Sequence, residues 1–208
     1  MKEYRTIIFD FDGTVADSMS VLLRVYASLS DELGLRELKS GDVANLRNMK
    51  PFDVLRFIGV SIFRLPQLVH KARSRYKDFL SEVVPISGMP FVLMELQKKY
   101  HLHILTSNEQ SIVLSFLTTN EITCFESVTS EWNFFGKDNS LKKMLKQLKL
   151  LPDDVLYIGD EVRDITACQK AGVDICSVSW GLNTEEILKK QQPTYLINDP
   201  DELLKLLI

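Results

Sequence analysis

The 208-residue sequence lacks any long uninterrupted apolar run, and it has few cysteines. No apolar run approaches the length of a membrane span, and the N-terminus lacks the basic-then-apolar pattern of a secretory signal. The three cysteines are odd in number, scattered and without metal-ligand spacing, so we expect free thiols and no disulfide framework. These absences predict a cytoplasmic protein with no membrane partner.

An excess of positive charge is also missing. The formal net charge is -3 and the sequence pI is about 5.7, which gives no electrostatic reason to expect nucleic acid or an anionic membrane as the main partner. The length suits one domain, or one domain that carries an insertion. We see no repeat or low-complexity segment, so the function must be sought in local motifs.

The most informative stretch is residues 7–14, which read Ile-Ile-Phe-Asp-Phe-Asp-Gly-Thr. A continuous apolar run that ends in a turn signal is typical of a strand buried on both faces of a parallel sheet. Asp10 should therefore lie at the carboxyl end of a central strand, where open α/β sheets bind their ligands. Asp12, Gly13 and Thr14 follow it in the turn.

The pattern after residue 88 alternates helices with strands, which predicts an α/β fold of three layers, with a parallel sheet between helices. We expect helices at 89–100, 110–117, 139–148 and 163–171, strands at 101–105, 127–129, 155–158 and 173–178, and a strand-helix pair at 195–207. Residues 18–82 show helical spacing without a convincing strand. The domain prediction is a core of residues 1–16 and 86–208, with a helical lid at 17–85 whose hinges lie near 16–18 and 85–88.

Polar side chains follow three later segments of the predicted core. Thr106, Ser107 and Asn108 come after one strand and precede a helix, where hydroxyl, amide and backbone N–H groups can hold an anion. Lys137 lies just before another predicted helix, and an acidic cluster that includes Asp160 follows a strand at Gly159. This set of groups suits a phosphoryl group and a hard divalent cation.

The chemistry follows from these residue types. Carboxylates at Asp10 and Asp160, with a backbone carbonyl near Asp12, could hold Mg²⁺, which prefers oxygen ligands. Lys137 and the Thr106 hydroxyl would bind the remaining phosphoryl oxygens, because an anionic nucleophile attacks a phosphate dianion only when its charge is neutralised. Asp10 is then the predicted nucleophile, and Asp12 the predicted acid and base.

The motifs resemble those of the haloacid dehalogenase superfamily, and all four signature motifs stand in order. They are Asp10-Phe-Asp12-Gly13-Thr14-Val15, Thr106, Lys137 and Gly159-Asp160-Glu161-x-x-Asp164. The helical insertion is similar to the α-helical cap of the phosphoglycolate phosphatase-like branch. The resemblance implies a Rossmann-like core, an aspartyl-phosphate intermediate and a Mg²⁺ cofactor. It assigns Asp10, Asp12, Asp160 and Asp164 to the metal, with Asp164 acting through water.

Asp12, the second aspartate of the first motif, limits the reactions that the resemblance allows. Dehalogenase members lack it and P-type ATPase members have threonine there, so Asp12 indicates a phosphatase or a phosphomutase. Mutases similar to β-phosphoglucomutase have a histidine in the opening cap helix, whereas residues 15–35 contain none. Phosphonatases need a cap lysine, and Lys39 and Lys50 are available without diagnostic context. Hydrolysis of a small phosphate monoester is the preferred prediction, with a mutase, a pyrophosphatase or a non-catalytic binding protein as alternatives.

Substrate contacts are predicted at Gly13, Thr14, Ser107, Asn108 and Arg47. Arg47 lies in a cap loop that faces the site in the phosphoglycolate phosphatase-like branch, and its guanidinium could bind a substrate carboxylate. Asn108 departs from the family, because many relatives have lysine near that position. The predicted partner is a small phosphorylated metabolite, and the chain is expected to be a monomer or a homodimer.

Overall fold

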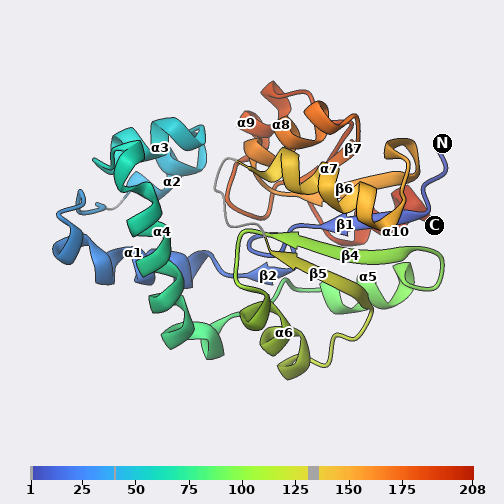
Figure 1. Ribbon diagram of the computed structural model, residues 1–208, viewed down its shortest axis with the longest axis horizontal. Coiled ribbons are helices and arrows are strands. Elements are labelled where there is room, and N and C mark those ends of the chain that lie inside the picture. The colour runs from blue at the N-terminus through green and yellow to red at the C-terminus, as the bar shows by residue number, and fades with distance from the viewer. Residues whose placement is uncertain (1, 40, 131–135) are drawn as a thin grey trace.

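A six-stranded parallel sheet forms the centre of the computed structural model, which describes residues 2–39, 41–130 and 136–208 (Figure 1). The strand order is β5-β4-β1-β6-β7-β8. The bounds are β1 Thr6–Phe9, β4 His101–Thr106, β5 Phe125–Ser130, β6 Val155–Gly159, β7 Asp174–Val178 and β8 Tyr195–Ile197. The chain builds outward from β1 in both directions, so a topological switch point lies beside this strand.

Both faces of the sheet are covered, as the alternation of side chains along β1 shows. Ile7 and Phe9 belong to one buried cluster and Ile8 belongs to the other, because successive side chains of a strand point to opposite faces. Helices α5 (Met89–Leu96), α6 (Gln110–Thr119) and α10 (Asp201–Leu207) contribute to the first cluster. Helices α7 (Lys137–Leu148), α8 (Val162–Ala171) and α9 (Glu185–Lys190) contribute to the second, which makes three layers.

The register of the strands aligns their carboxyl ends. Phe9 pairs with Ile104 of β4 on one side and with Ile158 of β6 on the other. Because the three strands are parallel and end within about two residues of this level, the chain segments that follow them meet at one edge of the sheet. Asp10, Thr106 and Asp160 stand at or just beyond these ends.

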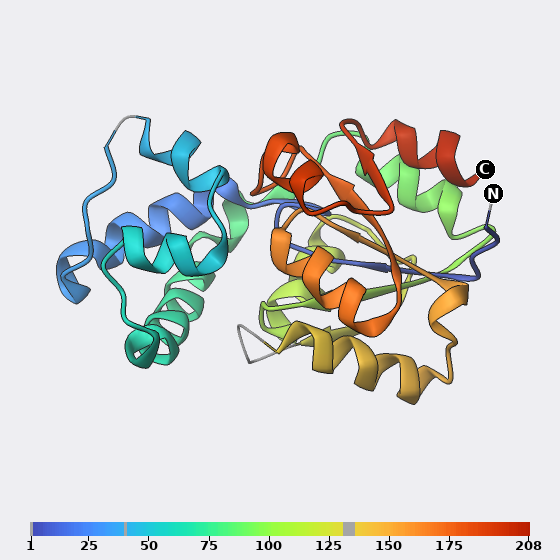
Figure 2. The ribbon, with the colours of Figure 1, turned by 90° about the horizontal axis from the view of Figure 1, so that it is seen from above.

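A group of helices lies beside the sheet as a separate body in both views (Figures 1 and 2). Its members are α1 (Met19–Leu33), α2 (Asp42–Arg47), α3 (Pro51–Phe57) and α4 (Leu65–Tyr76), with short 3₁₀ turns η1 (Ile62–Arg64) and η2 (Lys77–Glu82). The strands β2 (Ala16–Asp17) and β3 (Val84–Pro85) pair antiparallel where the chain enters and leaves this group. A small apolar cluster around Leu55 and Leu65 holds the helices together.

The predicted α/β fold with a parallel sheet and an inserted helical segment is confirmed. Differences are local: the helix expected to begin at Asn139 begins at Lys137, and the one expected to reach Tyr100 ends at Leu96. Helix α9, the turn η3 (Pro152–Asp154) and the β2–β3 pair were not predicted, because elements this short carry too little periodicity to be recognised. The three cysteines are free thiols, as expected.

Across the described ranges, none of the helices combines the length and the apolar character that crossing a lipid bilayer requires.

The packing of α6 gives a testable prediction. Phe116 is 2% exposed and packs edge-to-face on Phe11, with ring centroids 5.0 Å apart, whereas Leu114 on the same helix is 47% exposed. Phe116→Ala should lower the free energy of unfolding by about 3–5 kcal/mol, because it removes a buried ring and leaves a cavity. Leu114→Ala is the control and should cost roughly 1 kcal/mol or less in urea unfolding. Similar losses in both variants would contradict this packing.

Candidate active site

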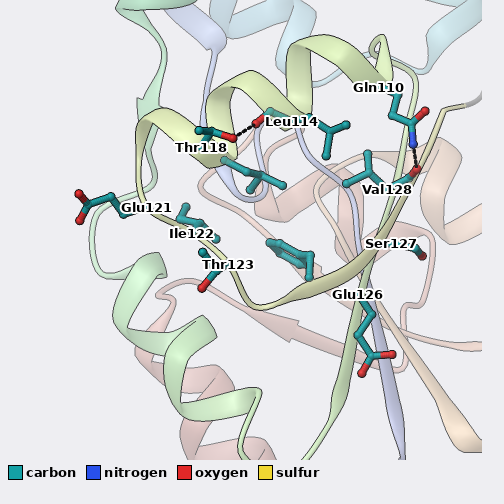
Figure 3. Close-up of a pocket in the computed structure, with 11 residues that line it drawn as sticks. Gln110, Leu114, Thr118, Glu121, Ile122, Thr123, Glu126, Ser127 and Val128 are labelled. Carbon is teal, nitrogen blue, oxygen red and sulfur yellow. Dashed lines mark hydrogen bonds between the residues drawn. The ribbon is translucent and has the colours of Figure 1, made fainter.

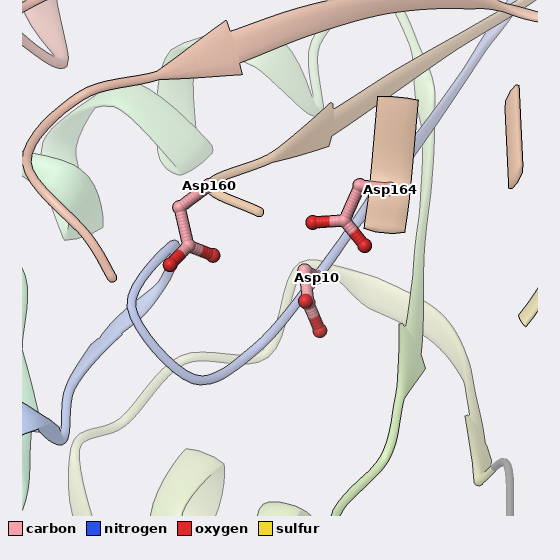
Figure 4. Close-up of side chains that lie close together, drawn as sticks. All are labelled: Asp10, Asp160 and Asp164. Carbon is pink, nitrogen blue, oxygen red and sulfur yellow. The ribbon is translucent and has the colours of Figure 1, made fainter. Parts of the chain in front are cut away.

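Three buried carboxylates meet at the switch point of the sheet. One oxygen from each of Asp10, Asp160 and Asp164 lies within 4.8 Å of the other two, and the three side chains lie close together (Figure 4). Asp10 is 2% exposed, and Asp160 and Asp164 are fully buried. Asp10 follows β1, Asp160 follows β6, and Asp164 lies in the first turn of α8. Like charges this close are unfavourable unless cations offset them.

Asp164 is fixed by the start of its helix. Glu161 is the N-cap of α8, and a capping box joins the two residues: the Glu161 side chain accepts from the backbone of Asp164, and Asp164 Oδ2 accepts from the Glu161 N–H at 3.0 Å. The other oxygen of Asp164 forms an ion pair with Lys137. The Asp164 carboxylate therefore caps the N-terminus of α8 with one oxygen and pairs with Lys137 through the other.

Lys137 lies between two of the carboxylates. Its Nζ donates to Asp10 Oδ2 at 2.6 Å and also pairs with Asp164, and its side chain is 3% exposed. Burial lowers the pKa of Lys137, but the charges of Asp10 and Asp164 raise it by more, so that its pKa is above the ordinary value. Lys137 is therefore a permanent cation at the first residue of α7, rather than just before the helix as expected.

Asp160 sits in a close-fitting cradle. Its Oδ1 accepts from the Thr14 hydroxyl at 2.8 Å, and its Oδ2 accepts from the Leu182 N–H at 2.6 Å. A Cβ atom at Gly13, where φ is +75°, or at Gly181 would lie 2.3 Å from Asp160 Oδ2. Only glycine permits this approach at the two positions. Gly13 and Thr14 both lie against Asp160, and their predicted contact with substrate stays a prediction.

The charge of the cluster fits a divalent cation. Burial raises the pKa of Asp160 well above its usual range, and neighbouring carboxylates add to the effect. Burial also raises the pKa of Asp164 to about 7, although Lys137 opposes it. When all of them are ionised, the four carboxylates of Asp10, Asp160, Glu161 and Asp164 exceed the cations of Lys137 and Arg163 by two charges, and without a further cation burial opposes that ionised state. Mg²⁺ carries this charge and prefers such oxygen ligands.

The side chain of Asp12 points away from this cluster. Its Oδ1 accepts from the Tyr76 hydroxyl of α4 at 2.9 Å, and its Oδ2 accepts from Asn108 Nδ2 at 3.1 Å. Burial raises the pKa of the Asp12 carboxyl, which favours the protonated form more than water would. The carboxylate of Asp12 is thus not brought to the other three, and the prediction that it serves the metal rests on its backbone carbonyl.

The predicted anion-binding loop follows β4 directly. The Thr106 hydroxyl is fully buried and accepts from the Asn108 N–H at 3.0 Å. The carbonyl of Ser107 accepts from Arg73 of α4, and the carbonyl of Asn108 accepts from Ser130 at 2.8 Å. This loop is therefore held from both sides, and Asn108 links it to Asp12.

Arg47 joins the helical insertion to the core. Its guanidinium donates to the carbonyls of Leu182 at 3.1 Å and Gly181 at 3.0 Å, and its own carbonyl accepts from Asn183 at 3.0 Å. The loop that Arg47 contacts is the one that cradles Asp160. The predicted contact between Arg47 and a substrate carboxylate stays a prediction.

Two residues near the site were not predicted. Tyr76 contacts Asp12, and Arg73 reaches the Ser107 carbonyl from one turn earlier on α4. Their spacing of three places them on one face of the helix. That spacing was visible in the sequence, but nothing in it showed which face of α4 turns toward the core.

A cavity of about 380 Å³ extends from Asp12 into the helical insertion. A second hollow of about 640 Å³ lies between α6 and β5 (Figure 3). There Gln110 donates to the Val128 carbonyl at 2.9 Å, and the described lining residues include Glu121 and Glu126 but no lysine or arginine. The hollow lacks the positive charge that a phosphate needs, so the first cavity is the candidate substrate site.

The buried lysine-carboxylate cluster lies at the switch point of a parallel α/β core, beside an inserted helical segment, which is where enzymes of this architecture carry out their chemistry. The sequence model of the haloacid dehalogenase-like hydrolases matches residues 7–178, so the chain belongs to this family. The resemblance stated from the motifs is confirmed.

Relatives support the same class. The chain is 27% identical to a phosphoglycolate phosphatase of Synechococcus elongatus, over 97% of this chain and 96% of the relative. It is 23% identical to a pyrophosphatase of Bacillus mycoides, over 97% and 96% of the two chains. A crystal structure described as a predicted phosphatase from Clostridium acetobutylicum shares the fold, with a TM-score of 0.84, 20% identity and coverage of 98% of each chain. The expected enzyme class, a phosphatase of this family, is confirmed at this level.

The close contact between Gly13 and Asp160 predicts that a methyl group added at Gly13 lowers the free energy of unfolding by an unusual amount. Gly13→Ala should destabilise the protein more than Gly34→Ala. Both residues have positive φ, at +75° and +60°, but a Cβ at Gly34 meets nothing within 4 Å. Gly34→Ala should lose about 1–2 kcal/mol from backbone strain alone, and Gly13→Ala should lose clearly more in urea unfolding. Equal losses would show that Asp160 moves aside without cost.

Proposed function

We propose that the protein is a Mg²⁺-dependent phosphatase that hydrolyses a small phosphate monoester through an aspartyl-phosphate. One observation carries the proposal: two aspartates, two residues apart, occupy opposite kinds of environment. Asp10 is ion-paired to Lys137 beside two further carboxylates. Asp12 accepts hydrogen bonds from neutral donors, and burial raises the pKa of its carboxyl. Such a division separates a charged nucleophile from a proton donor.

In the first step, a carboxylate oxygen of Asp10 attacks phosphorus, and the bond between phosphorus and the leaving oxygen breaks. Asp12, protonated, gives its proton to that oxygen, so an alcohol leaves and an acyl phosphate remains on Asp10. Lys137 offsets the charge that gathers on the phosphoryl oxygens, and the hydroxyl of Thr106, whose oxygen is held by the Asn108 N–H, donates to one of them.

In the second step, Asp12 is ionised and accepts a proton from water as the water attacks phosphorus. The bond between phosphorus and Asp10 breaks, inorganic phosphate leaves, and the proton on Asp12 prepares it for another cycle. Hydrogen bonds from Tyr76 and Asn108 fix the position of the Asp12 carboxyl, and this fixed position suits its part in both steps.

Asp10, Asp160 and Asp164 would hold the Mg²⁺, with a backbone carbonyl near Asp12 as a further ligand. The bound cation supplies positive charge to the phosphoryl oxygens and lets the anionic nucleophile approach. Arg47 and the cradle residues Gly13 and Thr14 then act on the site by fixing the loops around Asp160.

The metal and the nucleophile can be tested together. Phosphate release from phosphomonoesters should require Mg²⁺ and stop with EDTA. Asp10→Asn should abolish release and also remove the rise in melting temperature that Mg²⁺ gives the native chain, because a ligand that binds the folded state stabilises it. Asp31→Asn, which removes an exposed carboxylate of α1, is the control and should retain both properties. Metal-independent release by the native chain would sink the proposal.

The role of Asp12 predicts a different pattern. Asp12→Asn should slow turnover of an alkyl phosphate by roughly 10²- to 10⁴-fold, because the leaving oxygen loses its proton donor. It should slow the first step of p-nitrophenyl phosphate much less, since nitrophenolate leaves without a proton, and rapid-mixing kinetics measure that step. The Mg²⁺ effect on melting temperature should persist. Loss of that effect would mean that the Asp12 side chain serves the metal instead.

A further inference from the structure

The cavity of about 380 Å³ has a polar end and an apolar body. The charged residues among its described lining are Asp12, Arg73, Glu161 and Arg163. All four lie at the core end, where Arg73 donates to the Ser107 carbonyl and Arg163 donates to Glu161 Oε1 at 2.6 Å. The rest of the wall runs into the helical insertion. The charged residues of the cavity are thus confined to its core end, where a phosphoryl group would react.

The wall inside the insertion is almost entirely apolar. Arg73 is the only charged side chain that described residues 17–85 contribute to it. Helices α1 to α4 supply most of the remainder, represented by Met19, Leu22, Leu46, Val54 and Ala72. Leu22 lines the cavity and is 39% exposed, so part of its apolar surface is not covered by protein. Such a surface gains free energy only when another apolar group covers it.

The position of Asp12 connects this surface to the reaction. Asp12 lines the cavity, and in the proposed function it protonates the leaving oxygen. Whatever group is attached to that oxygen must therefore extend from Asp12 into the cavity. A volume of about 380 Å³ is far larger than a two-carbon acid or a second phosphate group needs, and it lies in the range typical of sites for larger organic ligands.

We propose that the substrate is a phosphomonoester of an uncharged alcohol with an apolar alkyl or aryl body of several carbons, and that the helical insertion selects it by burying that body. This inference rests on the proposed phosphatase function and adds the substrate class. It distinguishes the chain from a phosphatase for a charged small acid or for pyrophosphate, whose leaving groups would bring charge against this apolar wall at a cost in desolvation.

The test is a homologous series. With Mg²⁺, kcat/KM should rise from ethyl to butyl to hexyl phosphate by roughly three- to fourfold per methylene, which is the gain expected when each CH₂ leaves water. Hexyl phosphate should also exceed phosphoglycolate and pyrophosphate. A flat series with measurable hydrolysis of ethyl phosphate or phosphoglycolate would overturn the inference and leave the phosphatase standing. Hydrolysis of none of these would overturn the proposed function and the inference with it.

Variants locate the effect in the cavity. Ala72→Phe fills part of it, and Leu22→Gln makes one wall polar at a position exposed enough to tolerate the change. Each should lower the ratio of kcat/KM for hexyl phosphate to that for ethyl phosphate by roughly tenfold. Phe63→Gln is the control, because Phe63 is 92% exposed on the same helical group and does not line the cavity. An unchanged ratio in Leu22→Gln, or an equal fall in Phe63→Gln, would contradict the assignment.

Discussion

The gathering of buried negative charge at the end of β1 is the constraint on which the rest of the structure depends. Asp10, Asp160 and Asp164 lie together with little access to solvent, and Lys137 is shared by two of them. Charges removed from water are expensive unless each finds partners, so the surrounding backbone is shaped to supply them. Asp160 accepts hydrogen bonds from the Leu182 N–H and the Thr14 hydroxyl. Asp164 accepts one from the backbone of the N-cap of α8.

The sheet supplies the stiffness that this arrangement requires. Ile7 and Phe9 are packed by helices on one face and Ile8 by helices on the other, so β1 cannot shift along its axis without disturbing both cores. The register with β4 and β6 then fixes the places where Asp10 and the loops at Thr106 and Asp160 begin. A site built on strand ends in this way is held more precisely than one built on a long loop.

The sequence was sufficient for the parts of the site that belong to strand ends. Apolar runs followed by polar residues located Asp10, Thr106 and Asp160, because burial on both sheet faces leaves a local pattern. Tyr76 and Arg73 were missed because α4 carries no mark of which side faces the core. The contact of Arg47 with the Gly181 loop and the shape of the cavity were likewise hidden. They depend on how helices pack against a distant loop, and helix packing angles are not encoded in local periodicity.

Asp12 shows how the two parts of the molecule are joined in one chemical group. Its carboxyl accepts one hydrogen bond from Asn108 on the core and another from Tyr76 on α4. Both donors favour the ionised form, whereas burial favours the neutral one. Withdrawal of α4 would remove one donor and admit water, with opposite effects on the Asp12 pKa. The same movement would open the cavity that begins at Asp12. Helix α4 therefore controls both the access of the leaving group to the cavity and the pKa of the Asp12 carboxyl that protonates it.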